Sequence, residues 1–215
     1  YLILNYCSAA YAAAERRLYV RKEEKDRSRL MKAALQEIPC DLTVSNVRYL
    51  NIFTGEIYPA QVDILDGVVV RVREEGQETA CPSREIYDGK DAYLIPGFID
   101  VHMHVESTMM IPEQLSRAVL PWGTTTICTD PHEIGNVMGI EGVEFMLENA
   151  KKSALRQYVL APSCVPAVPG LESSGASFEA PEIRTLLEKE GVIGIAEIMD
   201  FVGVYKDSPQ DARNY

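Results

Sequence analysis

Two histidines separated by one residue are the strongest chemical signal in this chain. His102 and His104 close the run Pro-Gly-Phe-Ile-Asp-Val-His-Met-His, which begins at Pro96. Side chains two apart in a β-strand point to the same side, so the two imidazoles face one point. Neighbouring imidazoles are good ligands for Zn, Mn or Fe. The alternative is a strand-end pair hydrogen-bonded to the backbone, but the pair ends an apolar strand that opens a series of strands and helices.

A carboxylate later in the chain is the second signal. Glu197 follows the apolar run Gly-Ile-Ala, which begins at Gly194 and reads as the end of another strand. Two divalent ions about 3.5–4 Å apart need a bridging anion from the protein, and Glu197 could supply it. The alternative is an acid that caps the next turn.

Further polar residues lie within the first of the predicted strands, at Asp100, or follow the strands closely. His132 could ligate a metal, hydrogen-bond a substrate or cap a loop. The candidates for binding substrate or supporting the metal ligands are Asp100, Glu106, Ser107, Asp130, His132, Glu133 and Ser163.

The second half of the chain alternates strands with helices. Its apolar and β-branched runs predict strands over 98–101, 124–128, 158–161 and 192–196, and helices over 112–120, 139–152 and 180–190. This α/β order predicts a parallel sheet whose strand ends lie at one edge, where a (β/α)8 barrel builds its sites. About four βα units fit, whereas such a barrel takes about 250 residues. We therefore expect residues 96–215 to be the incomplete first half of a TIM-like barrel.

The first half of the chain divides differently. Residues 9–37 contain no Gly or Pro and predict a helix ended by Pro39, so 1–38 is taken as a helical extension. Residues 39–95 predict a small β domain with strands over 41–50, 61–65, 68–72 and 92–95. The pair Asp66-Gly67 is a hairpin signal between two of these strands.

Charge and cysteine usage exclude several classes of protein. A net charge of −11 argues against binding the phosphate backbone of nucleic acids. The apolar run over residues 1–14 is shorter than the roughly 18 residues that span a bilayer. The five cysteines form no CxxC pair, which favours reduced thiols in a cytoplasmic protein. Because the sequence starts at Tyr1 without Met, we expect its recorded start to be incomplete.

Several stretches together resemble the adenine deaminase family of the amidohydrolase superfamily. The resemblance is continuous from about Asp41 to Tyr205. The histidine motif with its leading Pro-Gly-Phe-Ile-Asp is typical of the superfamily. The Val-Glu-Ser that follows His104 and the Asp-Pro-His-Glu-Ile from Asp130 point to the narrower family. Further matching stretches are Gly-Thr-Thr-Thr from Gly123, Pro-Ser-Cys-Val-Pro-Ala from Pro162 and Ala-Glu-Ile-Met from Ala196.

This resemblance implies a small β-sandwich beside a distorted (β/α)8 barrel that holds two divalent ions, Mn or Fe, with Zn as a further option. It implies that His102 and His104 ligate one ion and that Glu197 bridges both. Two more histidines and an aspartate, the expected general base, should lie beyond Tyr215. The implied full-length protein is a homo-oligomer, and the segment by itself is expected to be inactive.

The implied reaction is hydrolytic deamination of adenine to hypoxanthine by a metal-activated hydroxide. Glu106 could then receive N–H groups of the purine, or pair with a basic loop residue. Where the family often has Asn and Pro, this chain has Asp200 and Val202, close to the expected site. Two alternatives stay open: another amidohydrolase that acts on a cyclic amide or amidine, and a non-catalytic fragment or pseudo-enzyme.

Overall fold

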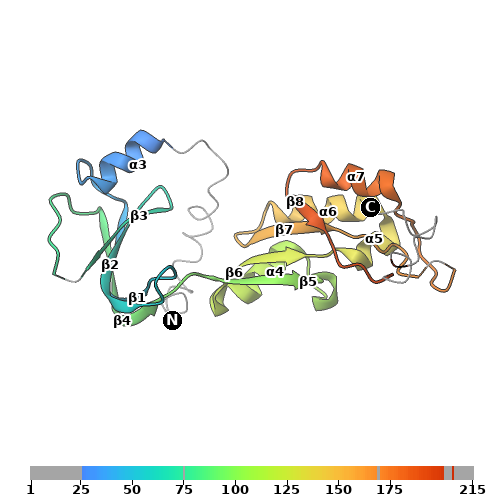
Figure 1. Cartoon of the computed structure of the whole chain (residues 1–215), viewed down its shortest axis with the longest axis horizontal. Helices are drawn as coiled ribbons and strands as arrows, with labels where there is room; N and C mark the ends of the chain where they lie inside the picture. The colour runs from blue at the N-terminus through green and yellow to red at the C-terminus, as the bar shows by residue number, and fades with distance from the viewer. Residues whose placement is uncertain (1–25, 75, 169, 201–204, 206–215) are drawn as a thin grey trace. The chain divides into compact units, whose positions relative to one another are not determined.

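A computed structural model describes residues 26–74, 76–168, 170–200 and 205, and the chain divides into two compact units between Pro96 and Gly97 (Figure 1). Only the end of the predicted N-terminal helix falls within the described residues, where α3 spans Arg27–Ala34. The helix ends there because Gln36 has a positive φ of 63°, so it stops before Pro39.

No helix in the described part of the chain has both the length and the apolar character needed to cross a membrane.

The first unit contains a four-stranded sheet in the order β3-β2-β1-β4. The strands are β1 (Leu42–Leu50), β2 (Ile57–Leu65), β3 (Val68–Glu74) and β4 (Glu85–Leu94). β1 pairs with β2 antiparallel and with β4 parallel. The predicted hairpin joins β2 to β3, and both of its turn residues, Asp66 and Gly67, have positive φ, as a type I′ turn requires.

Strand β4 is longer than the sequence pattern indicated. The sequence pattern predicted a strand only over 92–95, but β4 begins at Glu85 and runs through Asp88 and Gly89 with a register shift against β1. Lys90 and Asp91 take positive φ at this irregularity. Gly89 is required there because a Cβ would lie 2.3 Å from Cγ1 of Val47. The irregularity is therefore a bulge inside one strand.

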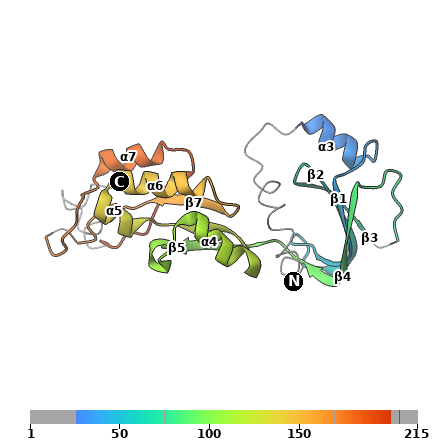
Figure 2. The same ribbon diagram turned by 180° about the vertical axis from the view of Figure 1, so that it is seen from behind.

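The second unit is a parallel sheet in the order β5-β6-β7-β8. Its strands are β5 (Phe98–Met103), β6 (Thr124–Thr129), β7 (Arg156–Ala161) and β8 (Val192–Ile195). The connections carry α4 (Pro112–Val119), α5 (His132–Met138), α6 (Ile140–Ala150) and α7 (Ala180–Leu187), with 3₁₀ turns at Glu106–Thr108 and Leu120–Trp122. Figures 1 and 2, seen from opposite sides, place α4, α6 and α7 on one face of this sheet.

Helix α5 is an addition to the elements expected from sequence. A helix was predicted from Gly139 onward, whereas the structure has two helices separated by Gly139, whose φ is 65°. Gly139 ends α5 and precedes α6. As a result, His132 and Glu133 lie on the first turn of a helix instead of in an irregular loop.

Apolar side chains fix the helices against the sheet in two clusters. One joins α6 and α7 to β7, and its members are Val143, Leu147, Val159, Ala161, Val165, Phe178, Ile183 and Leu186. The other joins α4 and α6 to β6, and its members are Val105, Leu115, Ile127, Met146 and Leu155. Both clusters lie on the helical side of the sheet, so packing there sets the positions at which the strands end.

Candidate metal centre

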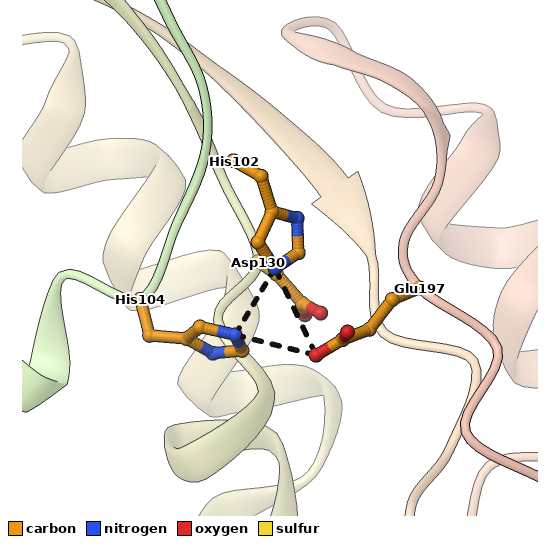
Figure 3. A group of neighbouring side chains, drawn as sticks. All are labelled: His102, His104, Asp130 and Glu197. Atoms are coloured by element: carbon orange, nitrogen blue, oxygen red, sulfur yellow. Dashed lines mark hydrogen bonds and ion pairs between the residues drawn. The ribbon is translucent and has the colours of Figure 1, made fainter.

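Four side chains converge where three strands of the second unit end (Figure 3). They are His102, His104, Asp130 and Glu197, and one donor atom from each lies within 4.8 Å of the others. The histidines come from β5 and the residue after it, Asp130 follows β6, and Glu197 lies two residues after β8. Parallel strands bring their carboxyl ends to one edge, which explains how positions far apart in sequence meet.

The spacing of the donor atoms suits a single cation. Nε2 of His102 lies 3.2 Å from Nε2 of His104, and Oε1 of Glu197 lies 3.7 and 3.5 Å from those two atoms. Metal–nitrogen and metal–oxygen bonds of about 2.0–2.2 Å place neighbouring ligand atoms of one ion roughly 3–4 Å apart. Imidazole and carboxylate together are ligands for Zn, Fe or Mn. The donor set therefore fits a divalent metal.

Asp130 gives an independent reason to expect a cation. Its side chain is fully buried, and neither carboxylate oxygen has a hydrogen-bond partner among the described residues. Burial raises its pKa to about 7, and the charges of Glu197, Glu106 and Glu133 add to this effect against that of His104. Buried polar groups without partners are rare and costly in folded proteins. A bound cation would satisfy the carboxylate.

His104 is held from its other side by Glu133. Oε2 of Glu133 lies 3.0 Å from Nδ1 of His104, and Ser107 donates a hydrogen bond of 2.8 Å to Oε1 of the same carboxylate. Burial alone lowers the pKa of His104, but the nearby charges of Glu133, Asp130 and Glu197 outweigh it and raise this pKa. The pKa of Glu133 is lowered despite burial, because Ser107 and His104 favour its charged form.

The remaining candidates from the sequence lie outside the group of four donors. Asp100 accepts a hydrogen bond from the backbone N–H of His102, and Glu106 accepts one from the N–H of Ile134. The other oxygen of Glu106, Oε2, is buried without a hydrogen-bond partner, and burial raises the pKa of this side chain. The ring centre of His132 is 6.5 Å from that of His104, and burial lowers the pKa of His132.

A further contact at this edge involves a residue that the sequence analysis did not single out. The backbone N–H of Met199 donates to Sγ of Cys164 over 3.0 Å, and the Oγ of Ser163 donates to the carbonyl of Glu197. Cys164 was treated as a reduced thiol and as part of the matching stretch from Pro162, but not as a site candidate. Its position in that stretch, directly after Ser163, was the available signal.

Comparisons with known proteins identify the family of the chain. The model of the amidohydrolase family matches residues 93–207. The adenine deaminase of Moorella thermoacetica is 41% identical over 180 residues, which cover 84% of this chain and 30% of that protein. The adenine deaminase of Listeria monocytogenes is 45% identical over 173 residues, which cover 80% and 29%. The chain thus spans about 30% of the length of these relatives.

A solved structure supports the fold. The L-hydantoinase (dihydropyrimidinase) from Arthrobacter aurescens superposes with a TM-score of 0.52 at 20% identity, over 73% of this chain and 32% of that one. At this identity the likeness concerns the fold alone. The family match covers more than half of the chain and includes all four donor residues. The chain belongs to the amidohydrolase family.

Proposed function

We propose that this chain is part of an adenine deaminase, an enzyme that hydrolyses adenine to hypoxanthine and ammonia at a divalent metal centre. The observation that carries the proposal is the convergence of His102, His104, Asp130 and Glu197 on one point. The narrower assignment is supported by relatives named adenine deaminase, which are 41% and 45% identical to most of the chain.

His102, His104 and Glu197 would hold the metal. Both contacts of Glu197 to the histidines use Oε1, and this carboxylate would be the group shared by two ions. The mixed nitrogen and oxygen donors suit Mn or Fe and also permit Zn. Metal bound here supplies an activated water nucleophile near neutral pH.

The protein's own residues then have distinct tasks around adenine. Glu106 holds one buried oxygen without a partner, so its carboxylate is suited to receive an N–H group of the purine ring. Its raised pKa also makes it suited to donate a proton to a ring nitrogen when protonated. His132 is close to His104 and keeps its neutral form because burial lowers its pKa, so it would hydrogen-bond substrate without adding charge.

The same proposal includes the architecture. The sheet β5–β8 with its helices would be the first half of a (β/α)8 barrel, and the sheet β1–β4 would be part of a β-sandwich. The strand–helix order and the likeness to the hydantoinase fold support this.

The test is an assay of the protein expressed from its complete reading frame. The metal-free protein is loaded with Mn²⁺ and incubated with adenine, and hypoxanthine and ammonia are measured together. Hydantoin and dihydropyrimidine are assayed in parallel. We expect one ammonia per hypoxanthine and no turnover without metal. If the protein hydrolyses the cyclic amides and leaves adenine intact, the proposed substrate is wrong. If the metal-loaded protein acts on none of the three compounds, the proposal of an enzyme is overturned.

A further inference from the structure

Glu133 connects the segment after β5 to the first turn of α5. Its Oε2 lies 3.0 Å from Nδ1 of His104, and its Oε1 accepts a 2.8 Å hydrogen bond from the Oγ of Ser107. The two carboxylate oxygens therefore have separate partners. Both partners lie in the segment after β5, with Ser107 26 residues and His104 29 residues before Glu133.

We propose that Glu133 is a positioning residue for the metal centre, holding the His104 ring so that Nε2 faces His102 and Glu197, and that Ser107 fixes Glu133 for this task. The inference rests on the proposed metal centre but concerns residues that need touch neither metal nor substrate.

The chemistry of the contact determines which nitrogen of His104 is available. An ionised carboxylate can only accept hydrogen bonds, so Nδ1 must carry the proton that it shares with Glu133. A neutral imidazole has one N–H, and Nε2 is then left with its lone pair. This lone pair is what a metal requires, and Nε2 is the atom 3.2 Å from His102 and 3.5 Å from Glu197.

The two-point attachment of Glu133 also limits its rotation. A carboxylate held by one hydrogen bond can turn about its side-chain bonds, and the imidazole can follow it. With Ser107 on Oε1 and His104 on Oε2, both ends of the carboxylate are fixed. No side chain among residues 26–74, 76–168 and 170–200 makes a comparable contact to Nδ1 of His102. Loss of Glu133 would thus affect one ligand of the pair selectively.

The experiment measures metal affinity directly, on protein expressed from the complete reading frame. Wild type, Glu133→Ala, Glu133→Gln and Ser107→Ala are stripped of metal and titrated with Mn²⁺, with the free ion followed by electron paramagnetic resonance. Glu148→Gln is the matched control, because Glu148 is an exposed acid of α6 paired only with Lys151 among the described residues. Circular dichroism of each metal-free variant checks that it is folded.

We expect Glu133→Ala to raise the Mn²⁺ dissociation constant about 10–100-fold, the usual effect of losing a partner that orients a metal-bound histidine. Glu133→Gln should lose less, because its amide oxygen still accepts from Nδ1–H, and Ser107→Ala should lose least. With saturating Mn²⁺, Glu133→Ala should recover kcat towards the wild-type value. Its KM for adenine should stay near that of wild type, because Glu133 does not bind substrate.

Four outcomes separate this inference from the proposed function. If folded Glu133→Ala and Glu133→Gln bind Mn²⁺ as tightly as the control, the positioning role is overturned and the proposed function is not. A raised KM at saturating metal, with unchanged Mn²⁺ affinity, assigns Glu133 to substrate and overturns it as well. A wild type that binds Mn²⁺ but leaves adenine intact overturns the substrate, while the expected series of affinities still supports Glu133. A wild type that binds none of Mn²⁺, Fe²⁺ and Zn²⁺ overturns both.

Discussion

Ser163, two residues after strand β7, donates a hydrogen bond from its Oγ to the backbone carbonyl of Glu197 over 2.8 Å. The residues are 34 positions apart in sequence. Next to this contact, Sγ of Cys164 accepts a hydrogen bond from the backbone N–H of Met199. The backbone at Glu197 and directly after it is therefore held by the loop that follows the neighbouring strand.

Removing the Ser163 hydroxyl should weaken metal binding without removing a ligand. In Ser163→Ala the carbonyl of Glu197 loses this donor, and the carboxylate is held less firmly. We expect the Mn²⁺ dissociation constant to rise about 10-fold, at the low end of the range for partners that orient ligands. Ser116→Ala is the control, because Ser116 is also buried and also donates to a carbonyl, but within α4. Equal Mn²⁺ affinity in the two variants would argue against this role for Ser163.

Loss of a proposed ligand should have a larger effect. In His102→Ala one of the two converging Nε2 atoms is gone, and His104 and the carboxylates cannot replace it. Loss of a residue that only orients a ligand lowers metal affinity by up to about 100-fold. We expect His102→Ala to lower the affinity for Mn²⁺ by more than this. Metal content after dialysis, measured by inductively coupled plasma mass spectrometry, checks this. Glu148→Gln should retain the wild-type content, and His102→Ala that also does so would show that the metal binds elsewhere.

The raised pKa of Asp130 should make the stability of the metal-free protein depend on pH. An aspartate in an unfolded chain has a pKa of about 3.9, whereas Asp130 in the folded state has a pKa of about 7. The folded state thus holds its proton more tightly, and stability falls as pH rises from about 4 to about 7. At higher pH the group costs a few kcal/mol.

Asp130→Asn removes this titration. We expect the metal-free variant to melt higher than metal-free wild type at pH 8 and to lose the stabilisation that Mn²⁺ gives wild type. The measurement is thermal unfolding from pH 4 to pH 8 with and without Mn²⁺. The difference between wild type and variant should grow with pH when metal is absent. Parallel melting curves across this range would contradict the prediction.

The histidine pair shows what local pattern can establish. The period of two along a strand was enough to predict that His102 and His104 face one point, and their Nε2 atoms are 3.2 Å apart. The parallel sheet of the second unit was predicted from the alternation of strand and helix patterns. These features depend on residues close in sequence, so the sequence carries them directly.

Asp130 and Glu133 show where local pattern stops. Both were candidates near one edge of the sheet, but nothing in their spacing indicated that Asp130 would be fully buried or that Glu133 would contact Nδ1 of His104. Those contacts depend on how β5 and β6 align and on helix α5. Gly135 lies inside α5 and Gly139 ends it, and glycine is a weak helix former, so the sequence pattern did not predict this helix.

A buried charge cluster in the first unit leads to the last prediction. Asp63 accepts hydrogen bonds from Arg73, Arg71 and Thr43, and it is 1% exposed. In Asp63→Ala the guanidinium groups of Arg71 and Arg73 would lose the negative charge that pairs with them in a largely buried site. Breaking such a pair from one side costs about 3–5 kcal/mol. The exposed pair of Arg48 and Asp91 has similar two-point geometry, so Asp91→Ala is the matched control and should change stability little.

The same cluster should make the first unit sensitive to acid. Burial alone raises the pKa of Asp63, but the hydrogen bonds from Arg73, Thr43 and Arg71 outweigh burial and hold this pKa below its ordinary value. The group therefore stabilises the fold above its unfolded pKa of about 3.9, and this contribution disappears as pH falls through the lower folded value. Denaturant unfolding of wild type and Asp63→Ala at pH 7 and pH 3 measures it. The two proteins should differ strongly at pH 7 and less at pH 3, because protonation removes in wild type what the substitution removes in the variant. An undiminished difference at pH 3 would show that the loss at pH 7 comes from packing and not from the charge of Asp63.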